Sequence, residues 1–112
     1  MRGALAAALA WAVVFPAAAQ VPGGDELFAR PDKGHCGACH QVPEAAGPAT
    51  RSDVGPRLEG KRMRELGRAA LRQLLVDPMP SNPDTIMPPY GRHRILDGAE
   101  IDRIVDYLYA LP

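Results

Sequence analysis

The sequence lacks a net charge and has few cysteines. Its thirteen lysines and arginines balance thirteen aspartates and glutamates, so the charge gives no reason to expect nucleic acid or an acidic surface as the partner. The chain contains two cysteines and a single tryptophan, Trp11. It shows no internal repeat and no linker between domains. These absences favour one folded domain.

The first nineteen residues have the pattern of a secretory signal peptide. Arg2 supplies a positive N-terminal region, residues 4–15 are apolar, and an A-x-A sequence ends at Ala19. A membrane anchor is the alternative, but the apolar run is short for a span and lacks a stop-transfer flank. We therefore expect residues 1–19 to be cleaved and residues 20–112 to form one domain in the periplasm.

The two cysteines stand together in the segment Cys36-Gly37-Ala38-Cys39-His40. A C-x-x-C-H motif is typical of covalent c-type haem attachment, in which both thiols bond to the haem vinyl groups. The histidine that follows is then held beneath the iron as its proximal ligand. The motif predicts one covalent haem c, attached through Cys36 and Cys39 and ligated by His40.

Three other interpretations of the cysteines explain less. A thioredoxin-like pair requires a βαβ context that the sequence does not show, and it leaves His40 without a role. A structural zinc site requires four well-spaced ligands, whereas His35 directly precedes the first cysteine. A disulfide across so short a turn is strained. An apolar haem instead supplies a centre for a small domain, which buries only a little over ~60% of its unfolded surface.

A Gly-Pro turn at residues 54–60 is the candidate partner of the proximal histidine. A ligating imidazole needs an acceptor for its second ring N–H, because that bond fixes the tautomer and the ring orientation. Pro56 can present its carbonyl on this rigid turn, and Leu58 can pack against the haem ring. An ordinary turn without this role is the alternative.

A proline-rich segment at residues 77–91 is the candidate source of the sixth iron ligand. Its prolines exclude a helix or a central strand but make a stiff loop. A methionine thioether fills the sixth position and raises the reduction potential, which favours electron transfer over oxygen or peroxide chemistry. We choose Met87, because two prolines fix the chain directly after it. Met79 is the second candidate, His93 is a third, and Met63 fits a helix core better.

Three segments have the apolar spacing of helices. The first is residues 23–30, where we expect a short helix that ends before Pro31. Residues 61–76 predict a second helix, although Gly67 can split it near its start. Residues 97–111 predict the clearest helix, which packs against the first and closes the shell beside the haem. The capping residues expected for the first and last helices are Asp25, Asp97 and Glu100.

Basic residues outnumber acidic ones seven to three between Arg51 and Arg72. The excess is either a solvated helix face or a docking patch for an acidic redox partner. The sequence does not identify the residues that bind the haem propionates. The candidates are Arg57, Arg72, Tyr90 and Arg92.

The order of these features is similar to that of the small class I cytochromes c, which are all-α proteins wrapped around one haem. A helix, C-x-x-C-H, a Gly-Pro-x-Leu-x-Gly turn, a helix, a methionine loop and a terminal helix cover nearly all of the mature chain. More narrowly, residues 77–91, with Lys33-Gly34-His35-Cys36 upstream, resemble the SoxX family of small cytochrome subunits in thiosulfate-oxidising SoxAX complexes. In that family the methionine of Met-Pro-Pro-Tyr is the distal ligand, which corresponds to Met87.

The resemblance implies a role and partners. SoxAX couples thiosulfate oxidatively to a cysteine of a carrier protein and releases two electrons, and the chemistry is attributed to a cysteine-ligated haem on the larger subunit. A SoxX-like chain takes electrons from that SoxA-like subunit and passes them to a soluble acceptor such as another cytochrome, so it is not catalytic alone. A free-standing periplasmic carrier for an oxidase or reductase is the alternative. A haem enzyme or sensor requires an open sixth position.

Overall fold

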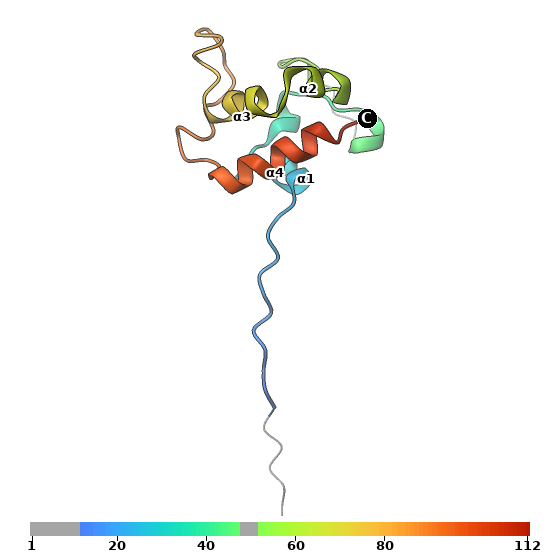
Figure 1. Ribbon diagram of the computed structural model, residues 1–112, viewed down its shortest axis with the longest axis vertical. Helices are drawn as coiled ribbons and strands as arrows, with labels where there is room; N and C mark the ends of the chain where they lie inside the picture. Colours follow the sequence, from blue (N-terminus) through green and yellow to red (C-terminus); the bar gives the residue numbers. More distant parts are fainter. Residues whose placement is uncertain (1–11, 48–51) are drawn as a thin grey trace, which may run out of the picture.

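The structure, a computed structural model, describes residues 12–47 and 52–112, and all regular structure in those two ranges is helical (Figure 1). The predicted all-α domain is therefore confirmed. In Figure 1 the helices pack together, and the described residues before them extend away from the helices. No helix in the described ranges is long and apolar enough to span a membrane. The described residues form four α-helices, which are α1 (Gly24–Ala29), α2 (Gly60–Leu66), α3 (Arg68–Val76) and α4 (Gly98–Tyr109).

Helix α4 begins with the capping box that the sequence predicts. The Asp97 carboxylate accepts a hydrogen bond of 2.8 Å from the Glu100 amide, and the Glu100 carboxylate accepts one of 3.0 Å from the Asp97 amide. These two bonds satisfy amides that have no partner within the helix. The apolar face of α4 is buried, with Ile101 and Ile104 each no more than 1% exposed. This helix is the long element against which the others pack.

The start of α1 differs from the prediction. Gly23, and not Asp25, is the N-cap, and the Gly23 carbonyl accepts the first helical bond from the amide of Leu27 at 3.0 Å. Gly23 has the extended backbone conformation of an N-cap residue but no side chain that could cap the helix. The helix begins at Gly24, which is earlier than a cap at Asp25 would allow. Asp25 lies instead in the first turn, where its negative charge faces the positive end of the helix.

Helix α1 lies directly on α4, as the apolar spacing predicts. A Cβ atom at Gly24 would stand only 2.1 Å from the Arg103 carbonyl oxygen, so the two backbones approach at a point where only glycine fits. Beside this contact, the rings of Phe28 and Tyr107 pack edge to face with centroids 5.2 Å apart. Leu27 is fully buried at the same crossing.

The predicted helix over residues 61–76 is divided into α2 and α3 at Gly67. This residue has φ +83°, a left-handed conformation that glycine adopts at low cost. The Gly67 amide still bonds to the Met63 carbonyl, and its carbonyl accepts from the Leu71 amide. One glycine therefore ends one helix and begins the next, and the chain turns there without a loop.

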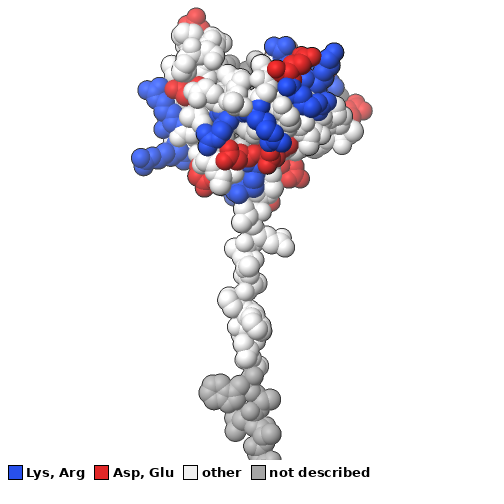
Figure 2. Space-filling view, viewed as in Figure 1, with Lys and Arg blue, Asp and Glu red and all other residues white. Residues whose placement is uncertain are grey.

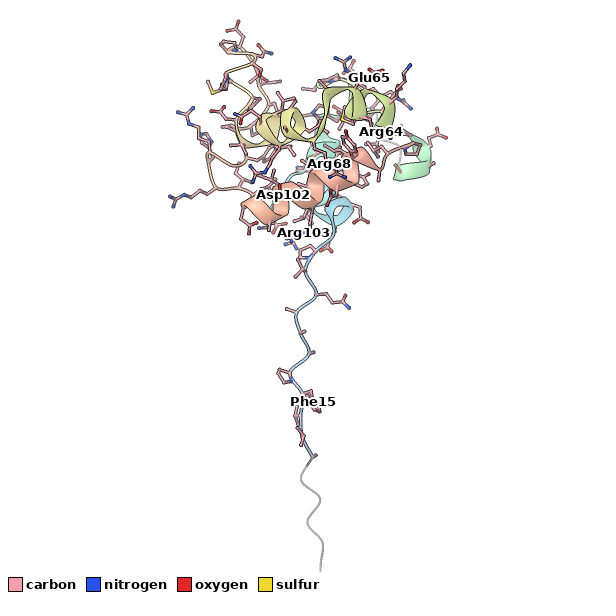
Figure 3. All side chains as sticks on the ribbon, in the orientation of Figure 1. Phe15, Arg64, Glu65, Arg68, Asp102 and Arg103 are labelled. Carbon is pink, nitrogen blue, oxygen red and sulfur yellow. The ribbon has the colours of Figure 1, made fainter. Side chains whose placement is uncertain are left out.

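The end of the chain is held against α2. Arg64 donates hydrogen bonds of 3.0 Å to the carbonyl oxygens of Tyr109 and Leu111, and the Gly60 amide donates one of 2.9 Å to the Pro112 carbonyl. In Figure 3 Arg64 lies where α2 meets the end of α4. The carbonyl of Tyr109, the last residue of α4, and two carbonyls that follow the helix are thus satisfied by α2.

Replacing Gly60 by alanine should destabilise the haem-loaded protein by about 1–3 kcal/mol, because the new Cβ would stand 1.8 Å from the Leu111 carbonyl oxygen. Gly98→Ala is the matched control, since Gly98 is also the first residue of its helix and its nearest neighbour would be a flexible Arg72 nitrogen at 3.4 Å. The control should be neutral or slightly stabilising. Denaturant unfolding of both variants measures the difference in their free energies of unfolding. Equal values would show that α2 does not pack closely against Leu111.

Candidate functional site

A cavity of about 490 Å³ brings together predicted site residues from separate segments. Its lining includes both cysteines, His40, Pro56 and Met87. The volume is typical of pockets that bind small molecules and cofactors, and most of the wall is apolar. Helices α2, α3 and α4 contribute much of that wall, through Met63, Leu66, Leu71, Leu74, Leu75 and Leu108.

The segment that carries the two cysteines is a tight turn on one side of the cavity. His35 has a left-handed backbone conformation, φ 46°, and a 3₁₀ turn follows over Cys36–Ala38. A bond of 2.8 Å from the His40 amide to the Cys36 carbonyl then closes the turn. This geometry places both cysteines and His40 on the wall of the same cavity. Their roles as haem attachment points and proximal ligand stay predictions that this placement supports.

The alternatives for the cysteines gain no support from the structure. Cys36 and Cys39 are not joined by a disulfide. Across residues 12–47 and 52–112 no cluster of three or more histidine, cysteine, aspartate or glutamate side chains is placed to hold a metal ion by itself. Burial raises the pKa of the Cys36 thiol to about 12, so this thiol is protonated at neutral pH when no group is bound to it.

His40, the predicted proximal ligand, is oriented by the turn that the sequence indicates. His40 Nδ1 lies 2.7 Å from the Pro56 carbonyl oxygen, the acceptor predicted above. When Nδ1 carries the proton of this bond, Nε2 is the nitrogen suited to ligate iron. Gly55 allows the close approach, because a Cβ there would lie 2.5 Å from the imidazole ring. Leu58 packs against the hydrophobic core and is not among the residues that line the cavity, so its haem contact stays a prediction.

The candidates for the distal ligand differ in whether they line the cavity and in how far they are exposed. Met87 is partly buried and lines the cavity, and its amide bonds to the Thr85 hydroxyl at 3.1 Å. Met79 is 42% exposed and His93 is exposed, and neither lines the cavity. Met63 also lines the cavity, but it belongs to the core face of α2 and is only 3% exposed. The position of Met87 in the loop fits the predicted role best.

The residues around the cavity fit a covalent haem c. The wall is largely apolar, a histidine with its ring held by a carbonyl stands next to two thiols, and a thioether lies on the methionine loop. Of the four propionate candidates, Tyr90 lines the cavity, whereas Arg57, Arg72 and Arg92 form ion pairs with Glu59, Asp102 and Asp77.

The turn before the cysteines is also held by an ion pair that the sequence did not indicate. Lys33 Nζ lies 2.7 Å from the carboxylate of Glu100, whose side chain is only 11% exposed. The hydrogen bond from Lys33 and the backbone N–H of Asp97 hold the pKa of Glu100 below its usual range. Glu100 therefore serves the capping box of α4 and the cysteine segment together.

Glu100→Gln should lower the free energy of unfolding at neutral pH by about 1 kcal/mol, because glutamine keeps the capping-box acceptor but loses the charge that pairs with Lys33. The folded carboxyl has a lowered pKa, so its contribution exists above the usual glutamate range and is lost as the pH falls through the lowered pKa. Wild type and variant should therefore converge in acid. Denaturant unfolding near neutrality and near pH ~3 measures this.

A suitable control for that comparison is Asp102→Asn, which removes an ion pair with Arg72 that is exposed on both sides. Such pairs contribute roughly 0–1 kcal/mol, and the pH response should change little. If Glu100→Gln retains the full acid sensitivity of the wild type, the pair with Lys33 is not its source.

The basic segment up to Arg72 is not a continuous positive face. Arg57, Arg68 and Arg72 pair with Glu59, Asp106 and Asp102. Figure 2 shows basic and acidic side chains interleaved over this side of the molecule. Lys61 and Arg62 on α2 are exposed, and the ion pairs of the described residues do not include them. A docking role for this surface stays a prediction.

Comparison with known proteins adds one match. The family model described as cytochrome C oxidase, cbb3-type, subunit III, matches residues 19–108. No curated protein matches the chain. The matched range contains the whole cavity lining, from His35 to Leu108.

Proposed function

We propose that this chain, which belongs to the cytochrome c family described as cytochrome C oxidase, cbb3-type, subunit III, is a SoxX-like relay subunit of a periplasmic thiosulfate-oxidising complex. As a member of this family it is a c-type electron carrier with one covalent haem c. The observation that carries the finer proposal is the segment 77–91. Its sequence resembles the SoxX loop, and its Met87 lines the same cavity as the two cysteines.

The residues around the cavity support electron transfer. When bound, haem c supplies a one-electron couple between ferric and ferrous iron. His40, held by the Pro56 carbonyl, and Met87, followed directly by two prolines, are the residues that would ligate the haem iron. A stiff loop limits rearrangement of the ligand between oxidation states. With both ligands in place, the haem would be suited to electron transfer more than to binding oxygen or peroxide.

In this proposal the chain has no free thiol for sulfur chemistry. Its two cysteines both line the haem cavity and are committed to haem attachment in this proposal. The step that joins thiosulfate to a carrier cysteine therefore belongs to a partner, which is a larger, SoxA-like haem subunit. The present chain receives electrons from that subunit and passes them to a soluble acceptor such as another cytochrome.

The proposed location is the periplasm, reached by cleavage of a signal peptide at residues 1–19. Residues 1–11, which include most of the apolar region of that peptide, lie outside the described residues. Residues 12–19 form no helix, and their side chains are exposed. They make no part of the haem cavity. Removal of this segment leaves the cavity lining intact.

The test is a pull-down of the tagged, haem-loaded protein from thiosulfate-grown cells, followed by a haem-stained gel and an assay of thiosulfate-dependent cytochrome reduction. We expect a second, larger haem polypeptide to co-purify with that activity. Cells grown without thiosulfate are the control, and they should yield less of the complex. A lone haem band without the activity would contradict the relay role and leave a free-standing electron carrier.

A further inference from the structure

Tyr90 lies where the methionine loop rejoins the body of the protein. Its side chain is buried, with the residue 8% exposed, and its hydroxyl donates a hydrogen bond of 2.7 Å to the Gly34 carbonyl oxygen. Gly34 precedes the cysteine segment by two residues, so the bond joins positions that are 56 residues apart in the chain. It connects the side of the cavity that carries Met87 with the side that carries the cysteines.

The acceptor of this bond is fixed in place. The Gly34 amide donates to the Leu27 carbonyl at 3.1 Å. A Cβ at Gly34 would lie 2.8 Å from Cys36 Sγ and 2.9 Å from the Leu27 carbonyl oxygen. The backbone is therefore confined between α1 and the attachment cysteine. Its carbonyl cannot follow Tyr90 if the loop moves.

The loop itself is held chiefly by short-range bonds. The Thr85 amide bonds to the Asn82 carbonyl at 3.1 Å, and the Met87 amide bonds to the Thr85 hydroxyl at 3.1 Å. The loop is joined to the end of α3 through the Gly91 amide and the Leu75 carbonyl, 3.2 Å apart. These bonds shape the loop and tie it to α3. They do not fix its distance from the cysteine segment, which the Tyr90 bond spans.

We propose that Tyr90 is a positioning residue, whose hydroxyl holds the methionine loop closed against the cysteine segment and so keeps Met87 on the iron. The inference rests on the proposed function, in which Met87 is the distal ligand. Burial raises the pKa of Tyr90 to about 12, so the hydroxyl remains a hydrogen-bond donor through neutral and moderately alkaline pH.

Removing the hydroxyl alone tests this role. Tyr90→Phe keeps the buried ring but leaves the Gly34 carbonyl without its donor, which raises the population of the open loop. A competing ligand such as imidazole binds iron only after Met87 leaves, so its apparent affinity follows the open population. We expect ferric, haem-loaded Tyr90→Phe to bind imidazole roughly tenfold more tightly than wild type, which corresponds to about 1.4 kcal/mol.

The matched control is Tyr107→Phe. Tyr107 also donates a hydrogen bond to a backbone carbonyl, that of Ala46 at 3.2 Å, but it lies outside the methionine loop and is not among the residues that line the cavity. Its imidazole affinity should equal that of the wild type. Equal affinities for Tyr90→Phe and Tyr107→Phe would overturn the positioning role.

Two further observations separate the possible failures. If Met87→Ala leaves the wild-type spectrum unchanged, the distal ligand in the proposed function is wrong, and the inference falls with it. If Tyr90→Phe does not retain haem, nuclear magnetic resonance of the wild-type holoprotein tests whether the Tyr90 hydroxyl forms its hydrogen bond to Gly34. A slowly exchanging Tyr90 hydroxyl proton near Gly34 supports the bond, whereas exchange as fast as that of an exposed tyrosine overturns it.

Discussion

Replacing Cys36 and Cys39 together by serine should abolish covalent haem completely. Serine keeps nearly the same shape at both positions but cannot form a thioether, and the chain has no other cysteine to take over. A haem-stained denaturing gel and the mass of the intact protein both measure the loss. The single variants are the controls, since each retains one thiol on the cavity wall and should keep a haem attached through one bond.

The double variant should also lose much of its fold. Without haem the largely apolar cavity of about 490 Å³ is left unfilled. The packing contacts that its lining then loses are large compared with the ~5–15 kcal/mol stability of a typical domain. Circular dichroism should show reduced helix and no cooperative melting. A double variant that is folded as stably as the wild type would mean that haem is not the centre of this domain.

The sequence predicted those parts of the fold that depend on neighbouring residues. The capping box of α4 follows from two residues three positions apart, and the break at Gly67 follows from the conformational freedom of one glycine. The bond between His40 and Pro56 spans sixteen residues, yet it could be anticipated, because a ligating histidine requires an acceptor and a Gly-Pro turn follows at a suitable distance.

The parts that the sequence did not predict are contacts between distant segments. Nothing near Tyr90 indicates that its hydroxyl meets Gly34, and nothing near Lys33 indicates Glu100. Glycines such as Gly60 are needed because another segment lies against them, which no local pattern reveals. The Asp25 cap was wrong for a related reason, since the start of a six-residue helix is set by its packing on α4 as much as by its own capping preferences.

Replacing Met87 by alanine should change the haem spectrum in both oxidation states and lower the reduction potential by about 0.1 V or more, a fraction of the ~0.8 V over which axial ligands tune haem proteins. Loss of the thioether would remove the proposed ligand, which favours ferrous iron, and would open the iron to carbon monoxide or cyanide. Redox titration and ligand binding to the haem-loaded variant measure both effects.

Met79→Ala is the control for this variant, because it makes the same change in the same loop at a side chain that is 42% exposed and outside the cavity lining. Its spectrum and potential should match the wild type. If Met79→Ala shows the changes instead, the ligand has been assigned to the wrong end of the loop. Because the SoxX resemblance places the ligand in Met-Pro-Pro-Tyr, that outcome would also remove the residue on which the proposed relay function chiefly depends.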